Sequence, residues 1–248
     1  PVRALAEGLA AAAGSLASIA DATGVRVVLA PEPEPGCTLE TVDETIAFWS
    51  RDLRLALGRD ADRLRPHLGL CADLAHLAVA GEDPSAAIAR LRRGGVPIAK
   101  VQASAALEVA LPAVDADAVT ALRAFDEPRW LHQASGRDGV GVWRRAADLP
   151  EVFADLDAWR RLAPWRVHFH APLHREQVAG VGTTHALVAP ALREAVSTEV
   201  AAPVVEVETY TWSALPGFSG SSADLAESVA AELRFARDAL ACDPAGAR

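Results

Sequence analysis

The chain has 248 residues, of which 51% are hydrophobic, and a formal net charge of −9 at pH 7. This length is enough for one large domain, and the acidic balance excludes a protein whose main partner is nucleic acid. The three cysteines form no CxxC pair and are too few for a disulfide framework, which favours a reducing cytoplasm. We find no apolar run of the roughly 20 residues that span a bilayer, so we expect no stable membrane insertion.

The first third of the chain is predicted to alternate between helices and strands. An Ala-rich amphipathic helix is expected over residues 2–21, followed by a buried strand over residues 27–31. Three prolines and a glycine then interrupt regular structure, and Thr38 is expected to cap the next helix. A second strand is predicted over residues 67–72, and Asp83 and Pro84 open a helix behind it.

The pattern changes after a third predicted strand at residues 97–103. The next strand, at 165–170, follows an interval about twice the ~30 residues of a typical βα unit. We therefore predict an insertion at about 108–160, containing a hairpin, on the face where barrel enzymes carry lids. A helix over 184–197 and a last strand over 203–209 follow. A final helix to about residue 241 completes a single unit over 1–242, and the tail at 243–248 is predicted to be disordered.

The five predicted strands share one property, which is that each ends on a residue able to bind a metal or a polar ligand. A strand that delivers its polar group at the carboxyl end and then enters a helix is typical of a (β/α) barrel wall. The chain also lacks methionine even at position 1, so we expect the natural chain to begin upstream. The predicted fold is α/β, an incomplete TIM barrel with about five of eight βα units. The strand-end residues are Glu32, Asp73, Gln102, His168 and Glu208.

Carboxylates and imidazoles at these positions suit a divalent cation, Zn²⁺ or Mn²⁺. Asp73 and His76 form a DxxH motif directly after a strand, where both can face one site; the alternative is a capping Asp beside a loop His. His168 and His170 are two residues apart on a strand and therefore point the same way, as metal ligands or as a buried structural pair.

The acidic candidates are two pairs at strand ends. Glu32 and Glu34 lie among prolines, so a solvated acidic loop is the alternative to a ligand role for Glu32 and to substrate binding by Glu34. Glu206 and Glu208 share one face of an apolar strand, where a carboxylate is costly unless it is paired or bound to a cation. We expect Glu32 and Glu208 to act as ligands and as acid or base.

Four further residues are candidates for substrate contacts or catalysis. Lys100 can hold a substrate oxyanion or act as a base, or pair with Glu32 or Glu208. Gln102 offers an amide oxygen on the same strand face. His132 in the insertion and Trp212 after the last strand can line the site, although a loop His and a packed Trp are the alternatives.

Several segments resemble the xylose isomerase-like TIM-barrel superfamily, which includes sugar isomerases, epimerases and endonuclease IV enzymes, and within it EboE-type metabolite-traffic proteins. The resemblance covers almost the whole length, and its most specific part is Phe-Asp-Glu-Pro-Arg-Trp-Leu-His-Gln at 125–133. The other matching segments are 31–35, 38–41, 71–79, 100–107, 165–173 and 207–212.

The resemblance implies a metal site formed by Glu32, Asp73, His76, His168, His170 and Glu208. It also implies a role in processing or export of a small metabolite, alongside other proteins of that pathway. Gln102 stands where the nuclease pattern has a histidine, which argues against a nuclease with three zinc ions. The hypotheses, in order, are a metal-dependent isomerase or epimerase, a metabolite-binding protein without turnover, and an endonuclease IV-like phosphodiesterase.

Overall fold

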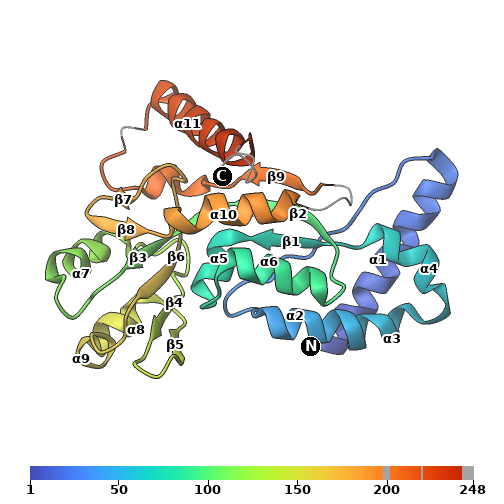
Figure 1. Ribbon diagram of the computed structural model, residues 1–248, viewed down its shortest axis with the longest axis horizontal. Helices are drawn as coiled ribbons and strands as arrows, with labels where there is room; N and C mark the ends of the chain where they lie inside the picture. Colours follow the sequence, from blue (N-terminus) through green and yellow to red (C-terminus); the bar gives the residue numbers. More distant parts are fainter. Residues whose placement is uncertain (198–201, 219, 242–248) are drawn as a thin grey trace, which may run out of the picture.

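The computed structural model describes residues 1–197, 202–218 and 220–241, and contains two β-sheets. The first is a parallel sheet with strand order β1-β2-β9 in the middle of the molecule (Figure 1). Segment 27–31 runs along the free side of β1, where Leu29 pairs with Leu68, but Pro31 and its neighbouring prolines have no N–H with which to extend a strand. The three strands are β1 (Leu70–Asp73), β2 (Ile98–Ala103) and β9 (Val204–Val207).

The second sheet is antiparallel, has six strands in the order β5-β4-β6-β3-β8-β7, and occupies one end of the molecule (Figure 1). Two of its strands, with the helices α7 (Ala116–Leu122), α8 (Leu149–Ala154) and α9 (Leu156–Trp159), come from the predicted insertion. The strands are β3 (Ala105–Val109), β4 (Ala134–Arg137), β5 (Trp143–Ala146), β6 (Trp165–Ala171), β7 (Gln177–Val178) and β8 (Val181–Thr183).

The predicted TIM barrel is wrong, whether complete or as five of eight units. In a barrel wall, β6 would lie between β2 and β9 and run parallel to both. In the structure, β2 pairs directly with β9. β6 instead pairs antiparallel with β3 and β4. The cause is the apolar segment Ala105–Val109, which forms a strand immediately after Ser104 and provides β6 with a partner in a separate sheet.

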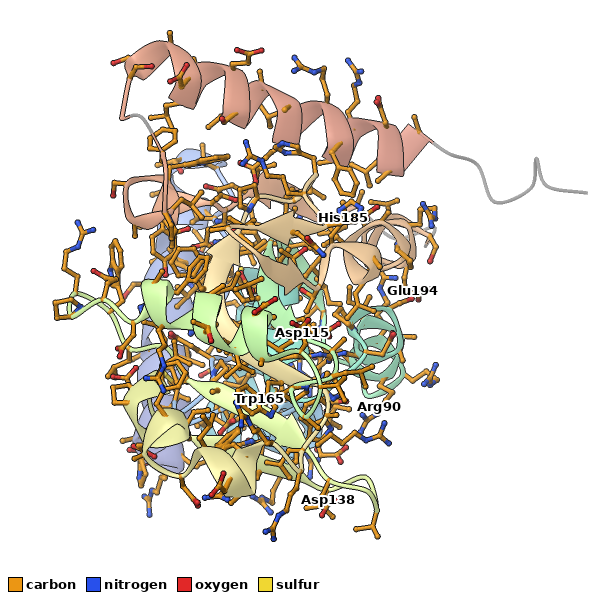
Figure 2. The ribbon with its side chains drawn as sticks, turned by 90° about the vertical axis from the view of Figure 1, so that its left-hand side faces the viewer. Arg90, Asp115, Asp138, Trp165, His185 and Glu194 are labelled. Atoms are coloured by element: carbon orange, nitrogen blue, oxygen red, sulfur yellow. The ribbon has the colours of Figure 1, made fainter. Side chains whose placement is uncertain are left out.

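Helices cover the parallel sheet. α6 (Pro84–Arg93) and α10 (His185–Val196) lie side by side against it, as Arg90 and Glu194 illustrate in Figure 2. The predicted helix starts at Asp83 and near residue 184 are confirmed, and the Asp83 carboxylate caps α6 through Ala86 N–H. α5 (Leu74–Val79) begins at the end of β1, and α11 (Ser222–Ala241) crosses the top of the molecule in Figure 1.

The N-terminal helices form a second hydrophobic cluster at the end of the molecule opposite the antiparallel sheet (Figure 1). Their second helix starts at Thr41, not at Thr38, because Thr41 and Glu44 form a reciprocal capping box. The segments are α1 (Val2–Thr23), α2 (Val42–Ala47), the π-helix η1 (Phe48–Leu53), α3 (Arg54–Leu57), α4 (Ala61–Leu64) and the 3₁₀ turns η2 (Gly58–Asp60) and η3 (Arg65–His67).

Helix α1 is the one described helix that is long and apolar enough to cross a membrane, by length and composition only. Its buried residues Ala6, Leu9, Ala13 and Ala17 recur every three or four positions and pack into the N-terminal cluster, as an amphipathic helix does. The 3₁₀ turns η4 (Arg123–Phe125) and η5 (Tyr210–Ala214) complete the elements. The predicted disordered tail at 243–248 lies outside the described residues.

Candidate metal centre

Three imidazoles converge where the two sheets meet. His168 and His170 lie on the same side of β6, with their Nε2 atoms 3.3 Å apart. His76 is in the first turn of α5, and its Nε2 lies 3.1 Å from His168 Nε2. All three side chains are buried, with 7%, 6% and 1% of the surfaces of His76, His168 and His170 exposed. The β6 spacing and the DxxH motif therefore place their rings in one cluster.

The other ring nitrogen of each histidine contacts an oxygen that can only accept a hydrogen bond. Nδ1 of His168 lies 2.7 Å from the amide oxygen of Gln133, and Nδ1 of His170 lies 2.8 Å from the Glu208 carbonyl oxygen. Nδ1 of His76 lies 3.2 Å from the Pro33 carbonyl oxygen. Each Nδ1 is therefore placed to donate a hydrogen bond, and the Nε2 of each ring faces the Nε2 atoms of the neighbouring rings.

Unprotonated nitrogens that face one another repel unless a cation lies between them. Burial lowers the pKa of His168 and of His170, which keeps their rings neutral and able to bind a metal. Two ligand nitrogens about 2.05 Å from one zinc ion, at the tetrahedral angle, would lie about 3.3 Å apart. The observed Nε2 separations of 3.1 and 3.3 Å match this spacing.

Asp73 uses its two carboxylate oxygens differently. Oδ1 accepts hydrogen bonds from His76 N–H, 2.7 Å away, and from the Ser104 hydroxyl, 2.9 Å away, so it caps α5. Oδ2 is buried and receives no hydrogen bond from an N–H or hydroxyl group of the described residues. The capping and ligand interpretations of this residue are thus compatible, because each needs a different oxygen.

Glu208 follows β9 and places a second carboxylate beside Asp73. Its Oε2 is also buried and receives no hydrogen bond from an N–H or hydroxyl group of the described residues, but its carboxyl group shares a hydrogen bond with that of Asp73. Burial and the neighbouring Asp73 charge raise the pKa of Glu208 to about 8. Two carboxylates this close disfavour double ionisation, and a bound cation would relieve the repulsion.

Glu32 lies at the edge of the same cluster. Its Oε1 is 3.2 Å from His76 Nδ1, and its side chain is 30% exposed. Burial, followed by the Asp73 charge, raises the pKa of Glu32. The described residues therefore contain three overlapping groups that can hold a metal ion: His76–His168–His170, Glu32–Asp73–His76 and Asp73–His170–Glu208.

The candidates on β2 differ in their surroundings. Gln102 pairs in register with Asp73, is buried, and has an amide oxygen without a hydrogen-bond partner in the described chain. Lys100 forms an ion pair with Glu206, with Nζ 2.5 Å from Oε2, and this hydrogen bond raises the pKa of Lys100. A protonated, paired ammonium is a poor general base.

The remaining sequence candidates lie around the cluster or away from it. Glu34 Oε1 is 3.9 Å from His168 Nδ1, on a side chain that is 39% exposed. His132 is buried behind β6, where its Nδ1 lies 3.1 Å from the His168 carbonyl oxygen. Trp212 is buried against Phe218 and lines a different pocket.

Sequence reasoning missed three residues that touch the cluster. Gln133 and Ser104 hold His168 and Asp73 by hydrogen bonds. The Tyr210 ring lies 5.0 Å from the His170 ring and 5.6 Å from Trp130, which places aromatic groups at the edge of the site. Gln133 and Trp130 belong to the 125–133 segment noted for its family resemblance, but no local pattern in that segment indicates a contact with β6.

No protein-family model, curated protein or solved structure matches the chain. The chemical interpretation of the centre therefore rests on its own geometry.

Proposed function

We propose that this protein binds a divalent cation at the histidine cluster and acts with it on a small polar metabolite. The convergence of three buried Nε2 atoms carries this proposal. Imidazoles favour zinc over the harder ions, with manganese as the second choice. Asp73 and Glu208 supply the charge that balances the cation.

The reaction class we propose is isomerisation or epimerisation of a polyhydroxylated or hydroxycarbonyl compound. A divalent cation in such a site polarises a carbonyl or hydroxyl group. Glu32 is the residue we assign to proton transfer, because it lies at the exposed edge of the cluster and burial raises its pKa above the ordinary value of a glutamate. Tyr210 and Trp130 present aromatic rings at the same edge, which suits the apolar face of a metabolite.

The resemblance to EboE-type proteins extends the proposal to processing or traffic of a metabolite with other proteins of one pathway, in the cytoplasm. A binding protein without turnover is the second candidate. The Lys100–Glu206 ion pair favours it, because it occupies the ammonium group that could have held a substrate oxyanion. A nuclease ranks last, given the net charge of −9.

The first experiment is elemental analysis and zinc titration of the full chain beside the double variant His168→Gln/His170→Gln. We expect about one equivalent of zinc, or two if the overlapping groups both fill, and loss of binding in the variant. His174→Gln is the matched control, because it removes an imidazole outside the cluster and should leave binding unchanged. Zinc content equal in all three proteins would refute the site.

Turnover is tested separately, by NMR detection of deuterium incorporation into a panel of aldoses and ketoses in heavy water. Proton transfer at a carbon next to a carbonyl exchanges that hydrogen with solvent. Glu32→Gln should abolish exchange while the zinc bound by His76, His168 and His170 remains. Zinc binding without exchange on any compound would leave the non-catalytic binding protein as the better account.

A further inference from the structure

A second pocket lies at the opposite end of the parallel sheet from the metal cluster. Asp73 is the last residue of β1, whereas the pocket is lined by Leu68, before β1, and by Ile98, the first residue of β2. Its volume is about 640 Å³, within the ~300–1,000 Å³ of small-molecule sites. No residue of the metal cluster lines it.

The walls of this basal pocket are apolar and already ordered. Leu53, Leu57 and Leu68 belong to the N-terminal hydrophobic cluster. Val96 belongs to the larger hydrophobic cluster, which includes residues of both sheets. Trp49 packs against both clusters. The pocket is thus the place where two cores meet without filling the space between them, and burial of an apolar group there would be favourable.

Among the residues that the structure describes, three arginines and no acidic residue line the basal pocket. Arg92 is engaged, since its guanidinium donates to the carbonyl oxygens of Glu194 and Ala195. Within the described part of the chain, Arg54 donates only its Nε, to the Ser50 carbonyl oxygen, and the Arg65 side chain makes no hydrogen bond. Neither Arg54 nor Arg65 forms an ion pair with any residue that the structure describes, although the protein carries a net charge of −9.

We propose that the basal pocket binds an aliphatic anion, a hydrocarbon chain that ends in a carboxylate or a phosphate. The chain would lie along Leu53, Leu57 and Val96, and the head group would meet Arg54 and Arg65. Guanidinium groups bind both kinds of head group through paired N–H donors. This inference is independent of the metal centre and adds a second ligand class to the protein.

The test is calorimetric titration of the full chain with decanoate, decyl phosphate and 1-decanol, all below micellar concentrations. We expect saturable binding of at least one of the two anions. The alcohol should bind about tenfold more weakly, because it cannot form the charge-assisted hydrogen bond that an anionic head group forms with an arginine. Comparison of the affinities for decanoate and decyl phosphate shows which head group the pocket prefers. EDTA removes any metal ion from the metal cluster. Anion binding that EDTA leaves unchanged would therefore show that the anion does not bind to a metal there.

Two variants locate the ligand. Arg54→Gln/Arg65→Gln should weaken anion binding by about tenfold or more, whereas Arg59→Gln/Arg93→Gln removes two exposed arginines outside the lining and should not. Ser50→Phe adds a ring at an exposed lining position and should block binding without altering the core. Circular dichroism checks that each variant is folded.

Three results would overturn the proposal. These are absence of saturable binding, equal binding of decanol and the anions, or full binding by folded Arg54→Gln/Arg65→Gln. A fourth contrary result would come from sedimentation in the same buffers. If the wild-type chain self-associates, Arg54→Gln/Arg65→Gln abolishes that association, and decanoate does not bind, the occupant of the pocket would be a second copy of the chain.

Discussion

At the scale of single residues, the metal centre depends on groups that would not bind the ion themselves. Ser104 is completely buried; its hydroxyl donates to Asp73 Oδ1 and accepts from Ala75 N–H, both at 2.9 Å. It therefore ties the strand end of β2 to the start of α5 and leaves Asp73 Oδ2 directed elsewhere. Outer partners of this kind set the orientation of metal ligands.

Replacing Ser104 with Ala should reduce both stability and zinc affinity. The buried Ala75 N–H would lose its acceptor, which costs about 1–3 kcal/mol in unfolding free energy. Zinc affinity should fall by about tenfold or more. Urea denaturation and chelator competition measure the two effects. Ser18→Ala, which removes only an exposed hydroxyl on α1, should change neither; an unaltered zinc affinity in Ser104→Ala would show that Ser104 does not orient Asp73.

At the scale of elements, helix α11 is hydrogen-bonded to the loops that follow β6 and β9, the strands that carry or lead to His168, His170 and Glu208. Glu232 of α11 is fully buried, and its Oε1 accepts from Leu173 N–H at 2.9 Å and from the Thr209 hydroxyl at 2.6 Å. Leu173 follows β6, which carries two histidines, and Thr209 follows Glu208. Burial raises the pKa of Glu232 despite these hydrogen bonds. An amide of the same length keeps an oxygen that can accept from both donors.

We expect Glu232→Ala to destabilise the fold by about 1–3 kcal/mol, because two buried donors lose their acceptor. Glu232→Gln keeps an acceptor oxygen and should cost clearly less. Thermal and urea unfolding compare the two, with Glu227→Ala as an exposed substitution on the same helix. Equal losses in the Ala and Gln variants would mean that packing volume, not the acceptor, matters at this position.

At the scale of the whole molecule, the centre lies between the two sheets. Asp73 and Glu208 come from strand ends of the parallel sheet, and His168 and His170 from the antiparallel sheet. An ion held by both sets would cross-link the sheets, and it would be bound only by the folded chain.

Removing the metal should therefore lower the melting temperature. Zinc at a thousand times its dissociation constant would stabilise the fold by about 4 kcal/mol, or about 10 °C for a chain of this length. Calorimetric scans with zinc and with EDTA measure the difference. His168→Gln/His170→Gln should melt at one temperature in both buffers, and a wild-type protein that does the same would contradict a metal that joins the sheets.

The sequence by itself determined the local features. The His168–His170 spacing on β6 depends on backbone geometry within a few residues, and the two rings share one side of the strand as predicted. Asp73 caps α5, which the sequence offered as the alternative to a ligand role. The helices α6 and α10 also start within a residue of their predicted capping or first residues. These elements need no information about distant partners.

Only the tertiary structure decided which strands are neighbours and which atoms complete the site. An apolar strand such as β6 can pair in either direction, and the antiparallel pairing with β3 depends on residues about 60 positions away. The same holds for Gln133 and Pro33, whose oxygens set the ring tautomers of His168 and His76. Pairing and hydrogen bonding over such separations depend on the packing of the whole chain, so local periodicity indicated the ligands but not the fold that assembles them.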